Sequence, residues 1–128
     1  MLAVSGRMKV QMQGQRLRLR VDEAGLVRLR AGEVLENLTR LPGGIECRQQ
    51  VRVIDGDAPL VQAVEGGWCF ELPGRDLDAY IARLPCREGL AFRLPLPDAN
   101  EIQIDFEVDV RDSVRSRGVR RKENLKDC

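Results

Sequence analysis

Residues 14–21 read GQRLRLRV, and residues 65–72 read EGGWCFEL. In both stretches, turn residues precede large apolar side chains at alternate positions, which is typical of a strand with one buried face. The apolar positions correspond at an offset of 51 residues: Leu17 with Trp68, Leu19 with Phe70, and Val21 with Leu72. This recurrence predicts one structural unit used twice, with pseudo-two-fold symmetry.

The same offset relates apolar residues across most of the chain. The further pairs are Val10 with Val61, Leu26 with Leu77, Leu29 with Tyr80, Val51 with Ile102, and Val53 with Ile104. We therefore predict pseudo-repeats over residues 8–57 and 58–110. If a binding site exists, we expect it where the two repeats meet.

Each repeat reads as strand, strand, helix, strand, strand. In the first repeat we expect strands at residues 9–13, 16–21, 34–41 and 45–54, with Asp22 capping a short helix that ends near residue 30. In the second repeat we expect strands at 60–64, 68–72, 89–96 and 101–110, and an amphipathic helix at 75–84. Hairpin-type turns imply antiparallel pairing. The prediction is an α+β fold whose two β-β-α-β-β repeats form an antiparallel barrel-like or two-layer sheet around two short helices.

The composition is that of one globular domain. With 128 residues and 43% apolar residues, the chain can bury its own core. We assign residues 8–110 to this domain, residues 1–7 to a flexible arm and residues 111–128 to a flexible basic tail. The tail residues Arg120, Arg121 and Lys122 favour solubility, with contacts to acidic partners as the alternative.

Several classes of function lack support in the sequence. The chain has no histidine, no nucleotide-binding glycine motif and no nucleophile elbow, so a non-enzymatic protein without a cofactor is favoured. No leader or membrane span is present, and basic and aromatic residues are not interleaved, so we expect neither membrane insertion nor specific nucleic-acid binding. Cys47 and Cys69 are predicted to be buried and Cys128 exposed, and free thiols favour the cytoplasm.

Two strands carry opposite charges at alternate positions. Arg16, Arg18 and Arg20 lie on one, and Asp105, Glu107 and Asp109 on the other, so cross-strand ion pairing is the simplest interpretation. Two alternatives stay open. The arginines could bind an anion or a partner, and two of the carboxylates could hold Mg²⁺ or Mn²⁺ together with a phosphate substrate. The aromatic residues Trp68, Phe70, Tyr80 and Phe106 are predicted to lie in the core.

Residues 8–20 (MKVQMQGQRLRLR) and 104–106 (IDF) resemble the opening and the end of a family of small uncharacterised bacterial proteins. The resemblance spans residues 8–107, although the family usually has Asn-Ser where this chain has Gln15 and Arg16. It implies a bacterial cytoplasmic protein and no catalytic residues. Eight strands with charged faces are similar to the triphosphate tunnel enzymes, whose E-x-E-x-K opening this chain lacks.

Together these features favour a cytoplasmic protein-interaction or self-associating domain that binds a protein partner or a second copy. The alternative is an anion- or phosphate-binding domain that uses the arginine strand and the acidic strand, and only this alternative involves Mg²⁺.

Overall fold

The computed structural model describes residues 7–86 and 88–109 and contains eight strands and two short helices in these ranges. The first repeat holds β1 (Met8–Gln13), β2 (Arg16–Val21), α1 (Glu23–Arg30), β3 (Leu35–Leu41) and β4 (Ile45–Ile54). The second holds β5 (Leu60–Val64), β6 (Gly67–Pro73), α2 (Gly74–Ile81), β7 (Leu90–Pro95) and β8 (Glu101–Val108). The predicted α+β class and the β-β-α-β-β order of both repeats are confirmed.

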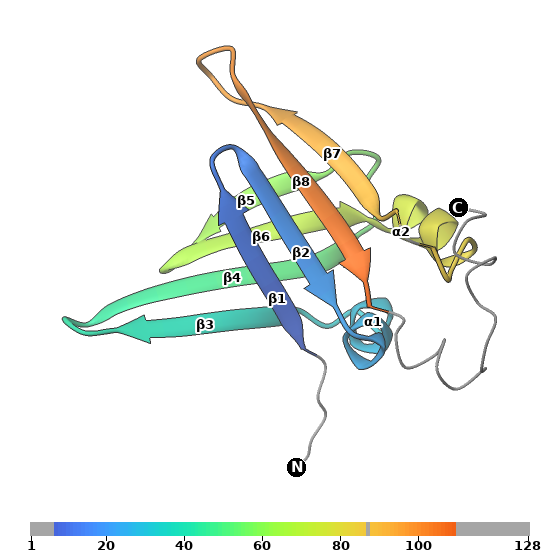
Figure 1. The fold of residues 1–128 in the computed structure, drawn as a ribbon, viewed down its shortest axis with the longest axis horizontal. Helices are drawn as coiled ribbons and strands as arrows, with labels where there is room; N and C mark the ends of the chain where they lie inside the picture. The colour runs from blue at the N-terminus through green and yellow to red at the C-terminus, as the bar shows by residue number, and fades with distance from the viewer. Residues whose placement is uncertain (1–6, 87, 110–128) are drawn as a thin grey trace.

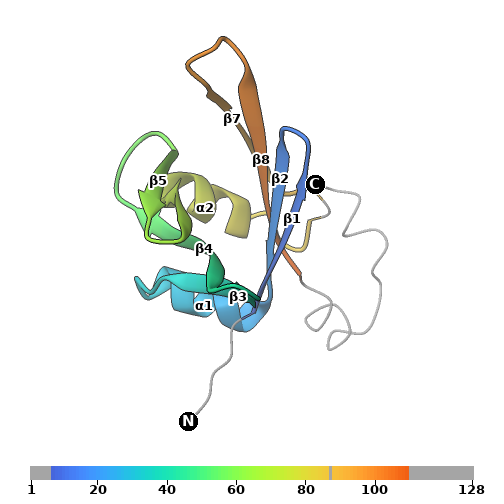
Figure 2. The same ribbon diagram turned by 90° about the vertical axis from the view of Figure 1, so that its left-hand side faces the viewer.

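The strands form two four-stranded sheets rather than a closed barrel. Sheet A has the order β1-β2-β8-β7, and sheet B has the order β3-β4-β6-β5. Each sheet therefore takes one hairpin from each repeat. The sheets cross face to face, and both helices lie at one end of them (Figure 1; Figure 2). Of the two predicted arrangements, the structure has the two-layer one.

The strand pairing differs from the all-antiparallel expectation at the centre of each sheet. The four hairpin pairs are antiparallel, as predicted. The central pairs, β2 with β8 and β4 with β6, are parallel. Turn residues in the sequence predict pairing only between strands that follow each other along the chain. The central pairs join strands from different repeats, which no hairpin connects.

The offset between the repeats changes partway along the chain. It is 51 residues through the first hairpin and the helix, but β3 begins at Leu35 and β7 at Leu90, which are 55 positions apart. The offset grows because the connection from α2 to β7 is longer than the equivalent connection from α1 to β3. Register confirms the larger offset, because Leu35 pairs with Val51 just as Leu90 pairs with Phe106. The predicted matches of Val51 and Val53 with Ile102 and Ile104 were therefore wrong by four positions.

The core lies between the two sheets and under the helices. Phe70 of sheet B and Phe92 of sheet A have ring centroids 5.7 Å apart, and Tyr80 of α2 meets the Phe106 ring edge-on at 6.4 Å. The Tyr80 hydroxyl accepts a hydrogen bond from the backbone N–H of Val108 at 2.9 Å, which fixes α2 on β8. Tyr80, Phe70 and Phe106 are fully buried, as predicted, whereas Trp68 is only partly buried.

Asp22 caps α1 as expected. Its Oδ1 accepts hydrogen bonds from the backbone N–H of Gly25 at 2.7 Å and from that of Arg7 at 3.0 Å. The cap therefore also fixes the segment that leads into β1.

Candidate functional site

The arginine strand and the acidic strand lie side by side in the middle of sheet A. Strict alternation on β2 buries Leu17, Leu19 and Val21 and turns the three arginines to the outer face. The parallel register of β2 and β8 places Arg18 opposite Asp105 and Arg20 opposite Glu107. The predicted cross-strand juxtaposition of these charges is therefore observed.

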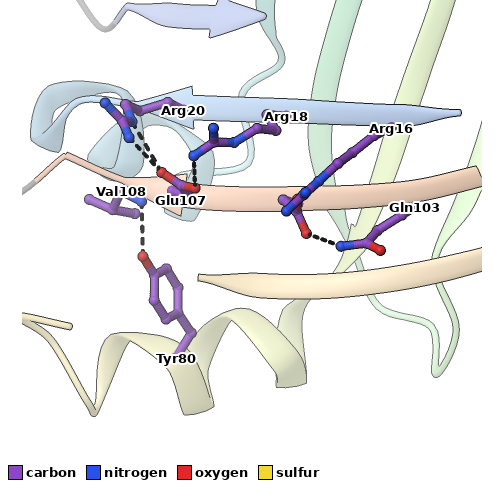
Figure 3. A network of polar contacts seen from close by, with 8 residues as sticks. Arg16, Arg18, Arg20, Tyr80, Gln103, Glu107 and Val108 are labelled. Atoms are coloured by element: carbon purple, nitrogen blue, oxygen red, sulfur yellow. Dashed lines mark hydrogen bonds and ion pairs between the residues drawn. The ribbon is translucent and has the colours of Figure 1, made fainter. Parts of the chain in front are cut away.

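Each of these arginines forms an ion pair with a carboxylate of β8. Arg16 Nε lies 2.8 Å from Asp105 Oδ2, and Arg18 and Arg20 each place an Nη2 atom 2.9 Å from Glu107 (Figure 3). Gln103 adds a hydrogen bond to Asp105 at 3.0 Å. The contacts form two neighbouring groups along the face, one around Asp105 and one around Glu107, and each uses both oxygen atoms of its carboxylate.

The network shifts the pKa values of its members. Burial raises the pKa of Glu107, but the hydrogen bonds and positive charges of Arg18 and Arg20 outweigh burial and hold it below its usual range. The hydrogen bond to Glu107, and then the charge of that carboxylate, raise the pKa of Arg18. The acids are nearly covered while the arginine side chains are 42–58% exposed. The face thus presents guanidinium edges to solvent and keeps its carboxylates beneath them.

Of the other predicted site residues, Asp109 is the one that the structure describes. Asp109 continues past β8, where its backbone N–H donates to Val21 O at 2.8 Å. Arg120, Arg121 and Lys122 lie outside the described residues. Within residues 7–86 and 88–109, no group of three or more Asp, Glu, Cys or His side chains is placed to hold a metal ion. On this outer face, a polar hollow of about 340 Å³ is lined by Gln11, Met12, Gln13, Arg16 and Arg18.

Sheet B carries a related ion pair with its polarity reversed. Arg52 of β4 donates to Glu71 of β6 through Nε at 3.0 Å, and these residues stand opposite each other across the parallel pair. By the offsets of the two repeats, Glu71 takes the place of Arg20, and Arg52 takes the place of Glu107. The central ion pair is therefore a shared element of both repeats.

A second candidate site is an apolar hollow that the sequence analysis did not predict. It measures about 660 Å³ and lies between edge strand β5 and β6 of sheet B and the β1–β2 and β7–β8 hairpins of sheet A, which all contribute to its lining. Its lining is mostly apolar and includes Met12, Leu60, Val61, Trp68, Leu94 and Ile102. Met12 is 64% exposed, Leu60 48% and Val61 46%. Large apolar side chains that stay open to solvent around one hollow are typical of an interaction site.

The other repeat provides an internal comparison for this hollow. At the offset of 55, Leu94 corresponds to Thr39, Ile102 to Cys47 and Ile104 to Gln49. On that side β1 packs against β3, and Gln49 is hydrogen-bonded to Asn37 at 2.7 Å and to Met12 Sδ at 3.6 Å. The first repeat therefore holds polar side chains at two of these three positions, whereas Ile104 of the second repeat is fully buried in the core. The sequence signal for the hollow is the difference in polarity between the two repeats. This difference can be seen only when the second half of each repeat is aligned at the offset of 55 residues.

The cysteines differ from expectation at two positions. Cys69 is a buried free thiol as predicted, and burial raises its pKa. Cys47 is a free thiol but exposed, because it lies on the β4 extension beyond the end of the core. Cys86 is disulfide-bonded rather than free. Among the described cysteines, Cys47 and Cys69 are free thiols, and only these two still support the prediction of a reducing compartment.

No protein-family model, curated protein or solved structure matches the chain. The resemblance to small bacterial proteins stays a prediction. Among the described helices, neither is long and apolar enough to cross a membrane.

Proposed function

We propose that this chain is a non-enzymatic protein-interaction domain whose binding site is the apolar hollow between β5 and the β7–β8 hairpin. The observation that carries the proposal is the contrast between the repeats. Leu94 and Ile102 line the hollow with apolar side chains where the equivalent positions of the first repeat hold Thr39 and Cys47. Leu94 and Ile102 pack against the core but are only partly buried, so the apolar surface that they leave open in the hollow supports a role in binding.

The energetics agree with binding through this hollow. Apolar surface gains roughly 25 cal/mol for each Å² removed from water, so Met12, Leu60 and Val61 favour association with an apolar segment. Trp68 is partly buried, lines the hollow and offers the large flat surface found in many binding hot spots. A partner segment that places apolar side chains in the hollow would cover these residues together.

Random-peptide display tests the proposal. We expect the intact chain to enrich peptides with alternating apolar residues, and their binding to shift the emission of Trp68, the single tryptophan, to shorter wavelength. Val61→Glu should abolish this enrichment because it buries a charge in the hollow. Val27→Glu is the matched control, since Val27 is 67% exposed on α1 and does not line the hollow. Equal enrichment by both variants, or none by the intact chain, would contradict the proposal.

The polar hollow at the arginine strand supports a second candidate function, anion binding. Arg16 and Arg18 line this hollow and are paired with Asp105 and Glu107, and Gln11 and Gln13 add amide donors. An anion such as triphosphate would have to compete with Asp105 and Glu107 for the guanidinium groups. A thermal-shift comparison of triphosphate with sodium chloride at equal ionic strength tests this function. A stabilisation of several degrees by triphosphate alone, lost in Arg18→Gln, would favour anion binding over the apolar site.

A further inference from the structure

The four edge strands of the two sheets differ in how they are protected against pairing. Edge strands usually carry charged residues or proline, which prevent another chain from adding a strand. β1 contains Lys9, β3 contains Glu36 and Arg40, and β7 contains Arg93 and Pro95. β5, with the sequence LVQAV, contains neither a charged residue nor proline. Among the strands that the structure describes, β5 is thus the one unprotected edge.

The free edge of β5 is also accessible. β5 is the last strand of sheet B and is paired with β6. Residues 60–63 are exposed, Leu60 and Val61 both line the apolar hollow, and successive side chains of the strand alternate between its two faces. Apolar side chains on both faces of an exposed edge are the pattern expected of a strand that pairs with another chain.

The sequence of β5 is complementary to itself. Two copies paired antiparallel about a two-fold axis at Gln62 would place Leu60 opposite Val64 and Val61 opposite Ala63 in both halves. Every cross-strand pair is then apolar except the central pair of Gln62 side chains, which can form hydrogen bonds with each other. No like charges meet across the axis.

From this complementarity, the open edge and the adjoining hollow, we infer that the partner is a second copy of this chain, joined through β5 in an isologous dimer. The two B sheets would then form one eight-stranded sheet, with the two apolar hollows side by side along the β5 pair. This inference rests on the proposed function, because it names the partner of the same surface. The five-residue strand is short, and stable interfaces bury about 1,200–2,000 Å². We therefore expect a dimer that dissociates on dilution.

The repeats supply a matched pair of variants for the test. Gln11 of β1 is the equivalent of Gln62 at the offset of 51, and both are exposed glutamines on edge strands. In Gln62→Lys, two like charges face each other across the proposed axis and should break the dimer. In Gln11→Lys, the same charge lies on the other sheet and should leave the dimer intact.

Sedimentation velocity over a concentration series measures the mass. We expect the intact chain and Gln11→Lys to approach twice 14.4 kDa at high concentration, and Gln62→Lys to stay near 14.4 kDa. Gln62→Glu should likewise be monomeric, and an equimolar mixture of the Lys and Glu variants should regain the doubled mass. This recovery separates a broken interface from a chain that fails to fold.

Three results would overturn the inference: a monomeric intact chain at every concentration, a dimer that persists in Gln62→Lys, or a mixture that stays monomeric. A persistent dimer would point to another edge, such as β3. A monomer that still enriches apolar peptides through the hollow would overturn the dimer and leave the proposed function standing. A monomer that enriches none would overturn both.

Discussion

At the scale of single residues, polar side-chain contacts hold strand β8 from both of its faces. On the inner side, the Tyr80 hydroxyl of α2 accepts a hydrogen bond from the backbone N–H of Val108. On the outer side, Glu107 forms ion pairs with Arg18 and Arg20 (Figure 3). These contacts act on neighbouring residues of one strand. Each can be removed without changing the apolar core.

Tyr80→Phe should lower the free energy of unfolding by about 1–3 kcal/mol, because the buried N–H of Val108 would lose its acceptor while the aromatic packing is kept. Urea denaturation measures the loss. Faster hydrogen exchange at the Val108 amide would locate it. Unchanged stability together with unchanged exchange would show that this hydrogen bond contributes nothing.

Glu107 should make stability depend on acidity. Its folded-state pKa lies below the unfolded value of about 4.3, so its ion pairs stabilise the fold above that pH and the stabilisation is lost as pH falls through the folded pKa. We expect Glu107→Gln to cost about 1 kcal/mol at pH 7, since the guanidinium groups are partly solvated. The two proteins should converge in stability as the pH falls through the folded-state pKa of Glu107, where its carboxylate becomes protonated. Urea denaturation at several pH values checks this, and parallel curves would contradict it.

At the scale of elements, the two central parallel pairs determine how the repeats join. In sheet B, β4 and β6 approach so closely at Gly67 that a Cβ atom there would lie 1.6 Å from the carbonyl oxygen of Arg48. In sheet A the equivalent position is Arg16, at the outer end of the arginine strand. The repeats therefore share a pairing pattern but not the closeness of the backbones.

Gly67→Ala should destabilise the protein by about 3 kcal/mol or more, because the added methyl group must push β4 and β6 apart along their shared hydrogen bonds. Gly56→Ala is the control, since the nearest atom to its added Cβ is a side-chain methyl of Ile54 at 3.4 Å. Thermal denaturation of the two variants provides the comparison. Similar melting temperatures would show that sheet B relaxes around the methyl group.

The reversed ion pair of sheet B supports a test by charge exchange. Arg52→Glu and Glu71→Arg should each cost about 1–3 kcal/mol, because each leaves like charges side by side and Glu71 is only 4% exposed. The double variant should regain more than half of the loss, since sheet A already holds the pair in that polarity. A double-mutant cycle from urea denaturation measures the coupling. Losses that simply add would show that the exchanged pair does not form.

At the scale of the whole molecule, the sequence predicted the elements better than their assembly. Alternation on β2 and the apolar stripe of α2 are local signals; β2 has the predicted bounds, and α2 begins one residue earlier and ends at Ile81, three residues before the predicted end. Local patterns could not show that β2 pairs with β8, because Arg18 and Asp105 are far apart in the chain. The ion pairs were predictable from charge complementarity. The apolar hollow was not, since Ile102 at the wrong offset matched a core residue, Val51.

Because each sheet takes one hairpin from either repeat, neither repeat can complete a sheet by itself. The central strand β2 cannot form its parallel pair until β8 has been synthesised, more than 80 residues later. Such long-range pairing is entropically costly to begin and slows folding. During synthesis the inner faces of β1–β4 would stay uncovered until the second repeat arrives. Newly made chains should therefore depend more on chaperones than their small size suggests.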